Sequence, residues 1–108
     1  MPRRGEVWSV RLDPSVGPEI SKTRPCLILS TNIVNDRRRT VVVVPLSTSA
    51  HPTPPLLVPV NCAERDVVAV TDQIRAVAKE RLLERIADVS STDLAAVATG
   101  VRRILELG

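Results

Sequence analysis

The sequence predicts a mainly β fold, a small antiparallel barrel or strongly curled sheet closed by a C-terminal helix. Val and Ile number 23, and 20 of them precede residue 91, where β-branched side chains favour strands. Trp8 is the only aromatic residue, so the core must be built from Val, Ile and Leu. With 108 residues, the chain is expected to form a single domain over residues 1–108.

The first half of the chain predicts two strands, each followed by a polar segment. Residues 5–12 alternate, which places Trp8 with Val10 and Leu12 on the core side. Residues 13–23 hold two prolines and a glycine and predict a loop long enough to be functional. Residues 24–30 form the second expected strand, and residues 31–40 a polar turn region ending in three arginines.

The middle of the chain predicts three further strands. Residues 41–46 begin with four valines, which indicates burial on both faces or one face lying in a subunit contact. Residues 47–55 form a second long loop and carry the only histidine, His51. Strands are then expected over residues 56–60 and 67–77.

The C-terminal part changes to a helical pattern. A short helical turn is expected over residues 78–83 and a short extended piece over 86–89. Ser90 then begins a helix, and Asp93 three residues later forms a weak capping box. One apolar stripe follows at spacings of three and four, formed by Leu94, Val97, Ala98, Val101, Ile104 and Leu105.

Charge and cysteine usage restrict the function classes. The net charge is +3, and residues 1–45 alone carry eight basic against four acidic side chains, so this half is expected to face an anion. Cys26 and Cys62 lack the spacing of a metal site and are too few for a disulfide framework, which favours a reduced, cytoplasmic setting. No leader and no apolar run near ~18 residues is evident, so no membrane span is expected.

Arg24 is the leading candidate for a functional residue. Pro25 favours an extended conformation at Arg24, and the apolar residues 27–29 anchor the strand behind it. A guanidinium held there suits a phosphate, because its planar donors stay charged and match phosphate oxygens in pairs. The alternative is an ordinary solvated arginine at a strand start.

Several short motifs lie in the order and at about the spacing of one known family. They are Arg4-Gly5-Glu6-Val7-Trp8, Leu12-Asp13-Pro14, Val16-Gly17-Pro18-Glu19, Thr23-Arg24-Pro25, Val44-Pro45-Leu46-Ser47, Asp72-Gln73-Ile74-Arg75 and Lys79-Glu80-Arg81-Leu82. From Arg4 to about Leu107 the chain resembles the MazF/PemK family, the toxins of bacterial toxin–antitoxin pairs.

The resemblance implies a fold and an activity. The fold would be an SH3-like barrel of antiparallel strands with a C-terminal helix, of the CcdB/PemK type, working as a homodimer. The activity would be sequence-specific cleavage of single-stranded RNA without a metal or cofactor, which stops growth and leaves a 2′,3′-cyclic phosphate and a 5′-hydroxyl. The nucleophile would then be the 2′-OH of the RNA, and a MazE-like antitoxin would lay a largely disordered segment along the RNA groove.

The resemblance also implies roles for particular residues. Arg24 would stabilise charge on the phosphate, and a hydroxyl would assist it, with Ser47 favoured over Thr48 because strand residues alternate. Glu19 would contact a base edge or help to transfer a proton, and Gln73 would contact a base. The alternative for Gln73 is a strand amide that satisfies a neighbouring group. Asn32, which follows the second expected strand, is a further candidate for a base contact. The segment from Glu19 to Arg24 departs from the family's Glu-Gln-Gly-Gly-x-Arg-Pro and lacks both glycines, which narrows its conformational range.

Alternatives stay open at this point. His51 is expected to be exposed and inert, and residues 37–39 either follow an RNA backbone or keep a turn soluble. A CcdB-like toxin that poisons gyrase, a non-catalytic nucleic-acid-binding barrel and a toxin inactivated by its loop changes are the competing interpretations.

Overall fold

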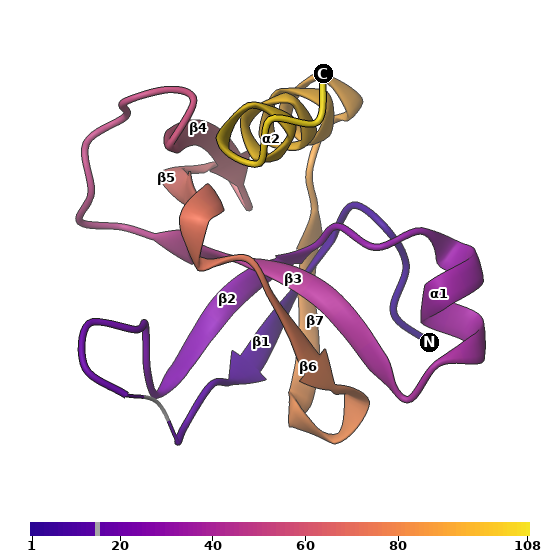
Figure 1. Ribbon diagram of the computed structural model, residues 1–108. Helices are drawn as coiled ribbons and strands as arrows, with labels where there is room; N and C mark the ends of the chain where they lie inside the picture. Colours follow the sequence, from indigo (N-terminus) through magenta and orange to yellow (C-terminus); the bar gives the residue numbers. More distant parts are fainter. Residues whose placement is uncertain (15) are drawn as a thin grey trace.

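The computed structural model describes residues 1–14 and 16–108, which form one curled antiparallel sheet closed by a C-terminal helix (Figure 1). The strands are β1 (Glu6–Arg11), β2 (Thr23–Ile28), β3 (Thr40–Ser47), β4 (Leu57–Cys62), β5 (Arg65–Val70), β6 (Arg75–Ala78) and β7 (Leu82–Asp88). The helices are α1 (Asn32–Arg37) and α2 (Ser91–Ile104), with 3-10 turns η1 (Thr71–Gln73) and η2 (Lys79–Arg81). The predicted fold class is confirmed, in the form of a half-barrel.

Strand β3 is the centre of the sheet and causes it to curl. The strand order is β4-β5-β3-β2-β1-β7, and β6 pairs with β3 outside this path. One edge of β3 therefore pairs first with β6, at Val41↔Val77, and then with β5, at Leu46↔Ala69. Because the two partners leave β3 in succession, the sheet bends at this strand.

Two apolar cores lie on the two faces of the sheet. The helix-side core lies under α2 and includes Val7, Leu27, Val44, Leu46, Val97 and Val101. The loop-side core lies on the other face and consists of Val10, Leu12, Cys26, Ile28, Val41, Val43 and Val77, with Trp8, Ile20 and Leu82 packed against it. Val41, Val43 and Val44 are therefore fully buried within one chain, and no subunit contact is needed to cover them.

Strand β1 differs from its prediction on one face. Trp8, Val10 and Leu12 do belong to one core, as the alternation indicated. Val7, expected on the solvent side, is fully buried because α2 covers that face as well. Register shifts between β1 and β7, at Val7/Trp8 and at Ser9/Val10, accompany this two-sided burial.

The C-terminal helix begins where the sequence predicted. The Ser90 hydroxyl accepts a hydrogen bond from the Asp93 amide at 3.0 Å, which is the capping interaction. The Asp93 carboxylate accepts from the Asn61 amide at 2.9 Å, and so ties α2 to β4. Val97, Gly100 and Val101 are buried, whereas Leu105 at the end of the predicted stripe is 50% exposed.

Three elements differ from the sequence prediction. Residues 32–37, expected in a polar turn region, form α1, where Thr31 caps the helix and Asn35 is fully buried. The expected strand over 67–77 is interrupted by η1, since the Thr71 hydroxyl donates to the Leu56 carbonyl at 2.8 Å and turns the chain. The expected extended piece over 86–89 is the end of the longer strand β7, whereas η2 confirms the short helical turn. None of the described helices is long and apolar enough to span a membrane.

Candidate active site

A polar pocket opens where β2 begins and β3 ends. Its volume is about 500 Å³. It brings together the predicted residues Glu19, Arg24, Ser47 and Thr48, from three separate segments of the chain. The other lining residues are Ile20, Ser21, Pro25, Leu46 and Ser49. The sequence analysis did not predict Ser21 or Ser49 as pocket residues. The only sequence feature that could have indicated them is that they lie close to Glu19 and Thr48 along the chain.

Arg24 and Ser47 lie just beyond the paired part of β2 and β3, which ends at Cys26 and Pro45. If this antiparallel register continued by two residues, it would bring Arg24 opposite Ser47. Directly opposite side chains share a face, with Cβ atoms about 5 Å apart. By strand alternation, Arg24 lies on the same face of the sheet as Cys26, and Ser47 on the same face as Val43. Cys26 and Val43 belong to the loop-side core, so Arg24 and Ser47 lie on that face just beyond the edge of this core.

The Ser47 hydroxyl is oriented by the turn that follows it. Its oxygen accepts hydrogen bonds from the Ser49 amide at 3.2 Å and the Ala50 amide at 3.3 Å. The same oxygen lies 3.4 Å from the Ser49 hydroxyl oxygen, and either hydroxyl can be the donor of that contact. Because the contact is long, the Ser47 proton can turn from it to another acceptor, such as a phosphate oxygen. Thr48 also lines the pocket and is exposed.

Arg24 presents an accessible positive charge. Its side chain is exposed and makes one long contact, from Nη1 to the Thr23 carbonyl at 3.4 Å. Among the described residues, no carboxylate lies within salt-bridge distance of Arg24. Beneath it, burial raises the pKa of the Cys26 thiol to about 12, although the nearby Arg75 charge acts in the opposite direction, so this thiol stays neutral.

Glu19 closes a tight turn on the opposite wall of the pocket. Its Oε1 accepts from the Val16 amide at 2.8 Å, and its own amide donates to the Val16 carbonyl at 3.3 Å. Gly17, at φ +58°, supplies the left-handed conformation inside this turn. Glu19 is thereby held in place by its own backbone while remaining exposed.

Two further loop contacts bear on predictions made from the sequence. Lys22 has φ +65° and therefore keeps a left-handed conformation at a position where the family pattern has glycine. Gln73 is absent from the pocket lining, but its Oε1 accepts from the Ile20 amide at 3.4 Å, so it touches the loop that forms the pocket wall.

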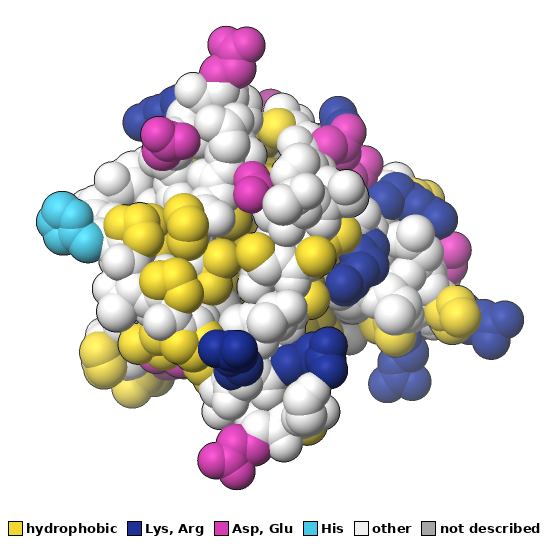
Figure 2. Space-filling view, turned by 90° about the horizontal axis from the view of Figure 1, so that it is seen from above, with side chains coloured by type: hydrophobic (Ala, Val, Ile, Leu, Met, Phe, Trp, Pro, Cys, Tyr) yellow, Lys and Arg dark blue, Asp and Glu magenta, His cyan; other side chains and the backbone are white. Residues whose placement is uncertain are grey.

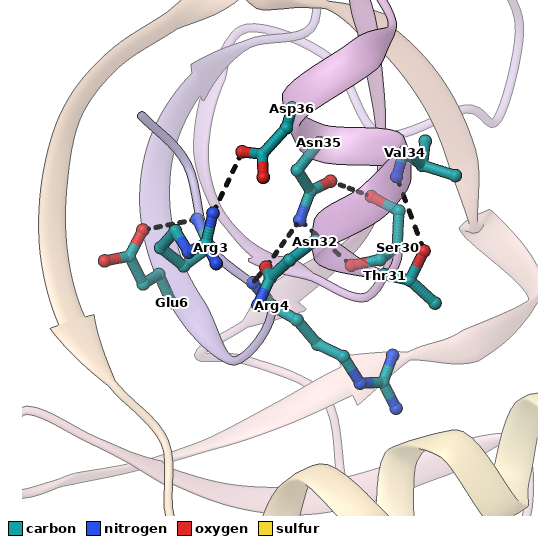
Figure 3. A network of polar contacts seen from close by, with 9 residues as sticks. All are labelled: Arg3, Arg4, Glu6, Ser30, Thr31, Asn32, Val34, Asn35 and Asp36. Carbon is teal, nitrogen blue, oxygen red and sulfur yellow. Dashed lines mark hydrogen bonds and ion pairs between the residues drawn. The ribbon is translucent and has the colours of Figure 1, made fainter.

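Asn32 lies at the opposite end of β2 from Arg24, at the start of α1 (Figure 3). Its Oδ1 accepts from the Arg4 amide at 2.8 Å and from the Asn35 side chain at 3.2 Å. The structure therefore does not bring Asn32 together with the pocket residues. Residues 37–39 lie at this same end of the sheet, where β3 begins, and His51 is exposed and outside the pocket lining.

The described side chains offer no cluster for a metal ion. Across residues 1–14 and 16–108, no three His, Cys, Asp or Glu side chains are grouped so that they could hold one. The charged groups of the pocket are one guanidinium and one carboxylate, and its remaining polar groups are hydroxyls and backbone amides. This set can bind a phosphodiester and exchange protons with it.

Comparisons with known proteins agree on one family. Residues 3–105 match the model of the PemK-like, MazF-like toxins of type II toxin–antitoxin systems. The chain is 34% identical to the endoribonuclease MazF9 of Mycobacterium tuberculosis, over 99% of this chain and 98% of that protein. It is 32% identical to the endoribonuclease EndoA of Bacillus subtilis, over 78% of this chain and 77% of that protein.

Solved structures show the same fold. An endoribonuclease in complex with its cognate antitoxin, from a mycobacterial species, is similar with a TM-score of 0.84 and 25% identity, covering 100% of this chain and 98% of that one. A MazF from Deinococcus radiodurans is similar with a TM-score of 0.86 and 23% identity, covering 97% and 96% of the two chains.

Proposed function

The chain belongs to the PemK-like, MazF-like toxins of type II toxin–antitoxin systems and is an endoribonuclease, and from that premise we propose that it cleaves single-stranded RNA at specific sequences. The observation that carries the proposal is that Arg24 and Ser47, which come from β2 and β3, line the same polar pocket. The cleavage site is this pocket, and the phosphate to be cleaved lies between these two side chains.

The reaction needs no nucleophile from the protein. The 2′-oxygen of the RNA forms a bond to phosphorus, and the bond from phosphorus to the 5′-oxygen breaks, which leaves a 2′,3′-cyclic phosphate and a 5′-hydroxyl. The 2′-OH loses a proton to a base, the 5′-oxygen takes one from solvent water, and negative charge grows on the phosphoryl oxygens in between. Arg24 stabilises that charge, and the Ser47 hydroxyl donates a hydrogen bond to one of the same oxygens while keeping its proton.

We assign Glu19 the role of the general base that accepts the proton of the 2′-OH. Within the described lining of the pocket it is the only carboxylate, and no histidine is present there. Its Oε1 is engaged by the Val16 amide, so Oε2 is the oxygen open to the substrate. The same carboxylate can instead accept from a base amino group, and the pH dependence of a Glu19→Gln variant distinguishes the two roles.

A non-catalytic binding module is less well supported. Modules that bind single strands without cutting them stack bases on exposed aromatic rings. Trp8, the only aromatic residue, packs against the loop-side core, and its Nε1 donates to Glu6 Oε1 at 3.1 Å. The pocket is instead lined by small polar and aliphatic side chains, as suits contact with a phosphate.

The proposal extends to an antitoxin and a second copy of the chain. A related mycobacterial endoribonuclease has been solved with its cognate antitoxin, and we assign this chain an antitoxin whose extended segment competes with RNA for the pocket. Figure 2 shows apolar side chains gathered on the face that carries α2. They surround a hollow lined by Pro54, Pro55, Val58, Pro59, Ala95 and Ala96. We assign this surface to the interface of a homodimer, and we place the protein in the cytoplasm.

Cleavage of a long single-stranded RNA in EDTA by the wild type and by Arg24→Ala tests the proposal. The wild type should give discrete fragments with 2′,3′-cyclic phosphate ends, and Arg24→Ala should lose at least about 100-fold in rate, as expected for removing a donor to the developing charge. Arg65→Ala, on β5 away from the pocket, is the control for a lost surface arginine. Intact RNA with the wild type, or Arg24→Ala cutting at the control rate, contradicts the proposed site.

A further inference from the structure

The segment between β1 and β2 forms one wall of the pocket and is closed at its base by backbone contacts. The Leu12 amide donates to the Lys22 carbonyl at 2.8 Å. The Lys22 amide donates to Asp13 Oδ1, also at 2.8 Å. Lys22 is in the left-handed region, which is unfavourable for a residue with a β-carbon. The Asp13 carboxylate, which accepts from the Lys22 amide, therefore helps to hold a disfavoured backbone conformation.

Arg81 reaches the same base from a distant part of the sequence. It lies at the end of η2, before β7, and its Nη1 donates to the Arg11 carbonyl at 3.0 Å and to the Asp13 carbonyl. Arg11 is the last residue of β1, and Asp13 lies two residues further on, at the start of the loop. Arg81 is half-buried, and one of its guanidinium nitrogens already serves two backbone acceptors.

These contacts fix the position of Glu19 relative to Arg24. The turn from Val16 to Glu19 is held by its own two hydrogen bonds, so it moves as a unit when the base of the loop moves. Arg24 follows Lys22 by two residues and is fixed to β1 by the pairing of Val10 with Arg24. A displaced base therefore changes the distance between the carboxylate and the phosphate-binding arginine.

We propose that Arg81 is a positioning residue of the RNA-cleaving site, and that with Asp13 it forms a clamp on the base of the Glu19 loop. This inference rests on the proposed function, since positioning has meaning only for a pocket that cleaves RNA. Arg81 acts through the loop and does not contact the substrate. Its loss misplaces Glu19, and a misplacement of about 1 Å can cost as much as 100-fold in rate.

Two measurements test the clamp, each on Arg81→Ala, Arg81→Lys and the control Arg65→Ala. The first is the kinetics of cleavage of a short RNA containing one cleavage site. Arg81→Ala should lower kcat about ten- to 100-fold while KM stays within about threefold, because RNA binding is retained and alignment is lost. Arg81→Lys, which keeps a donor for the carbonyls, should recover part of kcat.

The second measurement is amide hydrogen exchange in the peptide covering residues 12–24. Exchange there should be faster in Arg81→Ala and in Asp13→Ala than in the wild type, with exchange in β3 unchanged. Unchanged loop exchange, or a kcat for Arg81→Ala equal to that of the control, overturns the clamp. If Arg81→Ala instead raises KM, and RNA affinity falls less steeply with salt by the equivalent of about one phosphate contact, Arg81 binds RNA directly and the clamp is overturned. If the wild type leaves RNA intact, the proposed function fails, and hydrogen exchange still decides whether the loop is clamped.

Discussion

Replacing Gly100 by alanine should destabilise the protein, although the same change in most helices is stabilising. Gly100 lies within α2 and is buried against the segment that precedes β4. A β-carbon added there would lie 2.7 Å from the Pro55 carbonyl oxygen, 3.0 Å from Val58 Cγ2 and 3.2 Å from Thr71 Cγ2. The first of these distances is shorter than a β-carbon tolerates, so some part of the structure must move.

The magnitude follows from what is able to move. The Pro55 carbonyl is a backbone group that also accepts from the Thr71 hydroxyl at 3.2 Å, and the adjacent Leu56 carbonyl accepts from the Thr71 amide at 3.0 Å. No rotamer change relieves the overlap, so the cost falls in the upper part of the roughly 1–3 kcal/mol range for overpacking. Alanine recovers about 0.9 kcal/mol of helix propensity over glycine. The free energy of unfolding should therefore fall by about 1–2 kcal/mol.

Thermal and urea unfolding measure this difference, with Thr99→Ala as the control at an exposed position of the same helix. At about 2.1 cal/mol/K of unfolding entropy per residue, the loss corresponds to a fall in Tm of roughly 4–9 °C. Thr99→Ala should leave Tm unchanged or raise it slightly, because alanine is the better helix former. If Gly100→Ala raises Tm as much as the control does, α2 does not approach the segment before β4 as closely as the structure shows.

Two further predictions concern the hydroxyls and acid stability. Ser47→Ala should lower the RNA cleavage rate at least about ten-fold, because it removes a hydrogen bond to a charged group. Thr48→Ala should lower the rate less, because successive strand residues face opposite ways and the β2–β3 register, if continued past Cys26 and Pro45, brings Ser47 toward Arg24. A larger loss for Thr48→Ala would assign the role to Thr48. Burial raises the pKa of the Glu6 carboxyl, but hydrogen bonds from the Trp8 indole, the Arg3 amide and the Arg85 guanidinium outweigh it and leave the pKa below its ordinary value of 4.5. The ionised Glu6 carboxylate therefore stabilises the folded state above about pH 4.5, and this stabilisation is lost as pH falls through the lower pKa of the folded state. The urea unfolding midpoints of the wild type and Glu6→Gln should differ at pH 7 and converge near pH 3. A difference in midpoint that is unchanged at pH 3 contradicts this assignment.

Local patterns in the sequence predicted the elements whose signals are local. The capping of α2 by Ser90 depends on residues three apart, and the strand character of β3 depends on a run of valines. Helix α1 was missed because its signal is short and polar: it has one turn and a half of sequence, and what holds it is the buried side chain of Asn35. A buried asparagine looks like a loop residue in sequence, because its partners are not visible there.

Likewise, the candidate site was predicted in part. Arg24 was predicted from its place before Pro25 at a strand start, and Ser47, Thr48 and Glu19 were predicted from the resemblance. All four line the pocket. Asn32 was grouped with them because it follows the second strand, but a strand of six residues separates its two ends by roughly 20 Å. Residues that flank one strand are therefore neighbours in sequence and distant in the fold.

The sequence by itself determined the fold class, the place of Arg24 at the start of a strand and the start of the C-terminal helix. Composition, the Arg24-Pro25 pair and the Ser90 cap are the signals, and the last two act over only a few residues. Only the tertiary structure decided that Ser47 and Thr48 line one pocket with Arg24 and that Arg81 reaches the base of the loop before Arg24. Both decisions depend on strand register and on contacts between segments up to 70 residues apart. When two residues are this far apart in the sequence, the curl of the sheet decides whether their side chains meet. The curl results from all the strand pairings together, so no local sequence pattern predicts it.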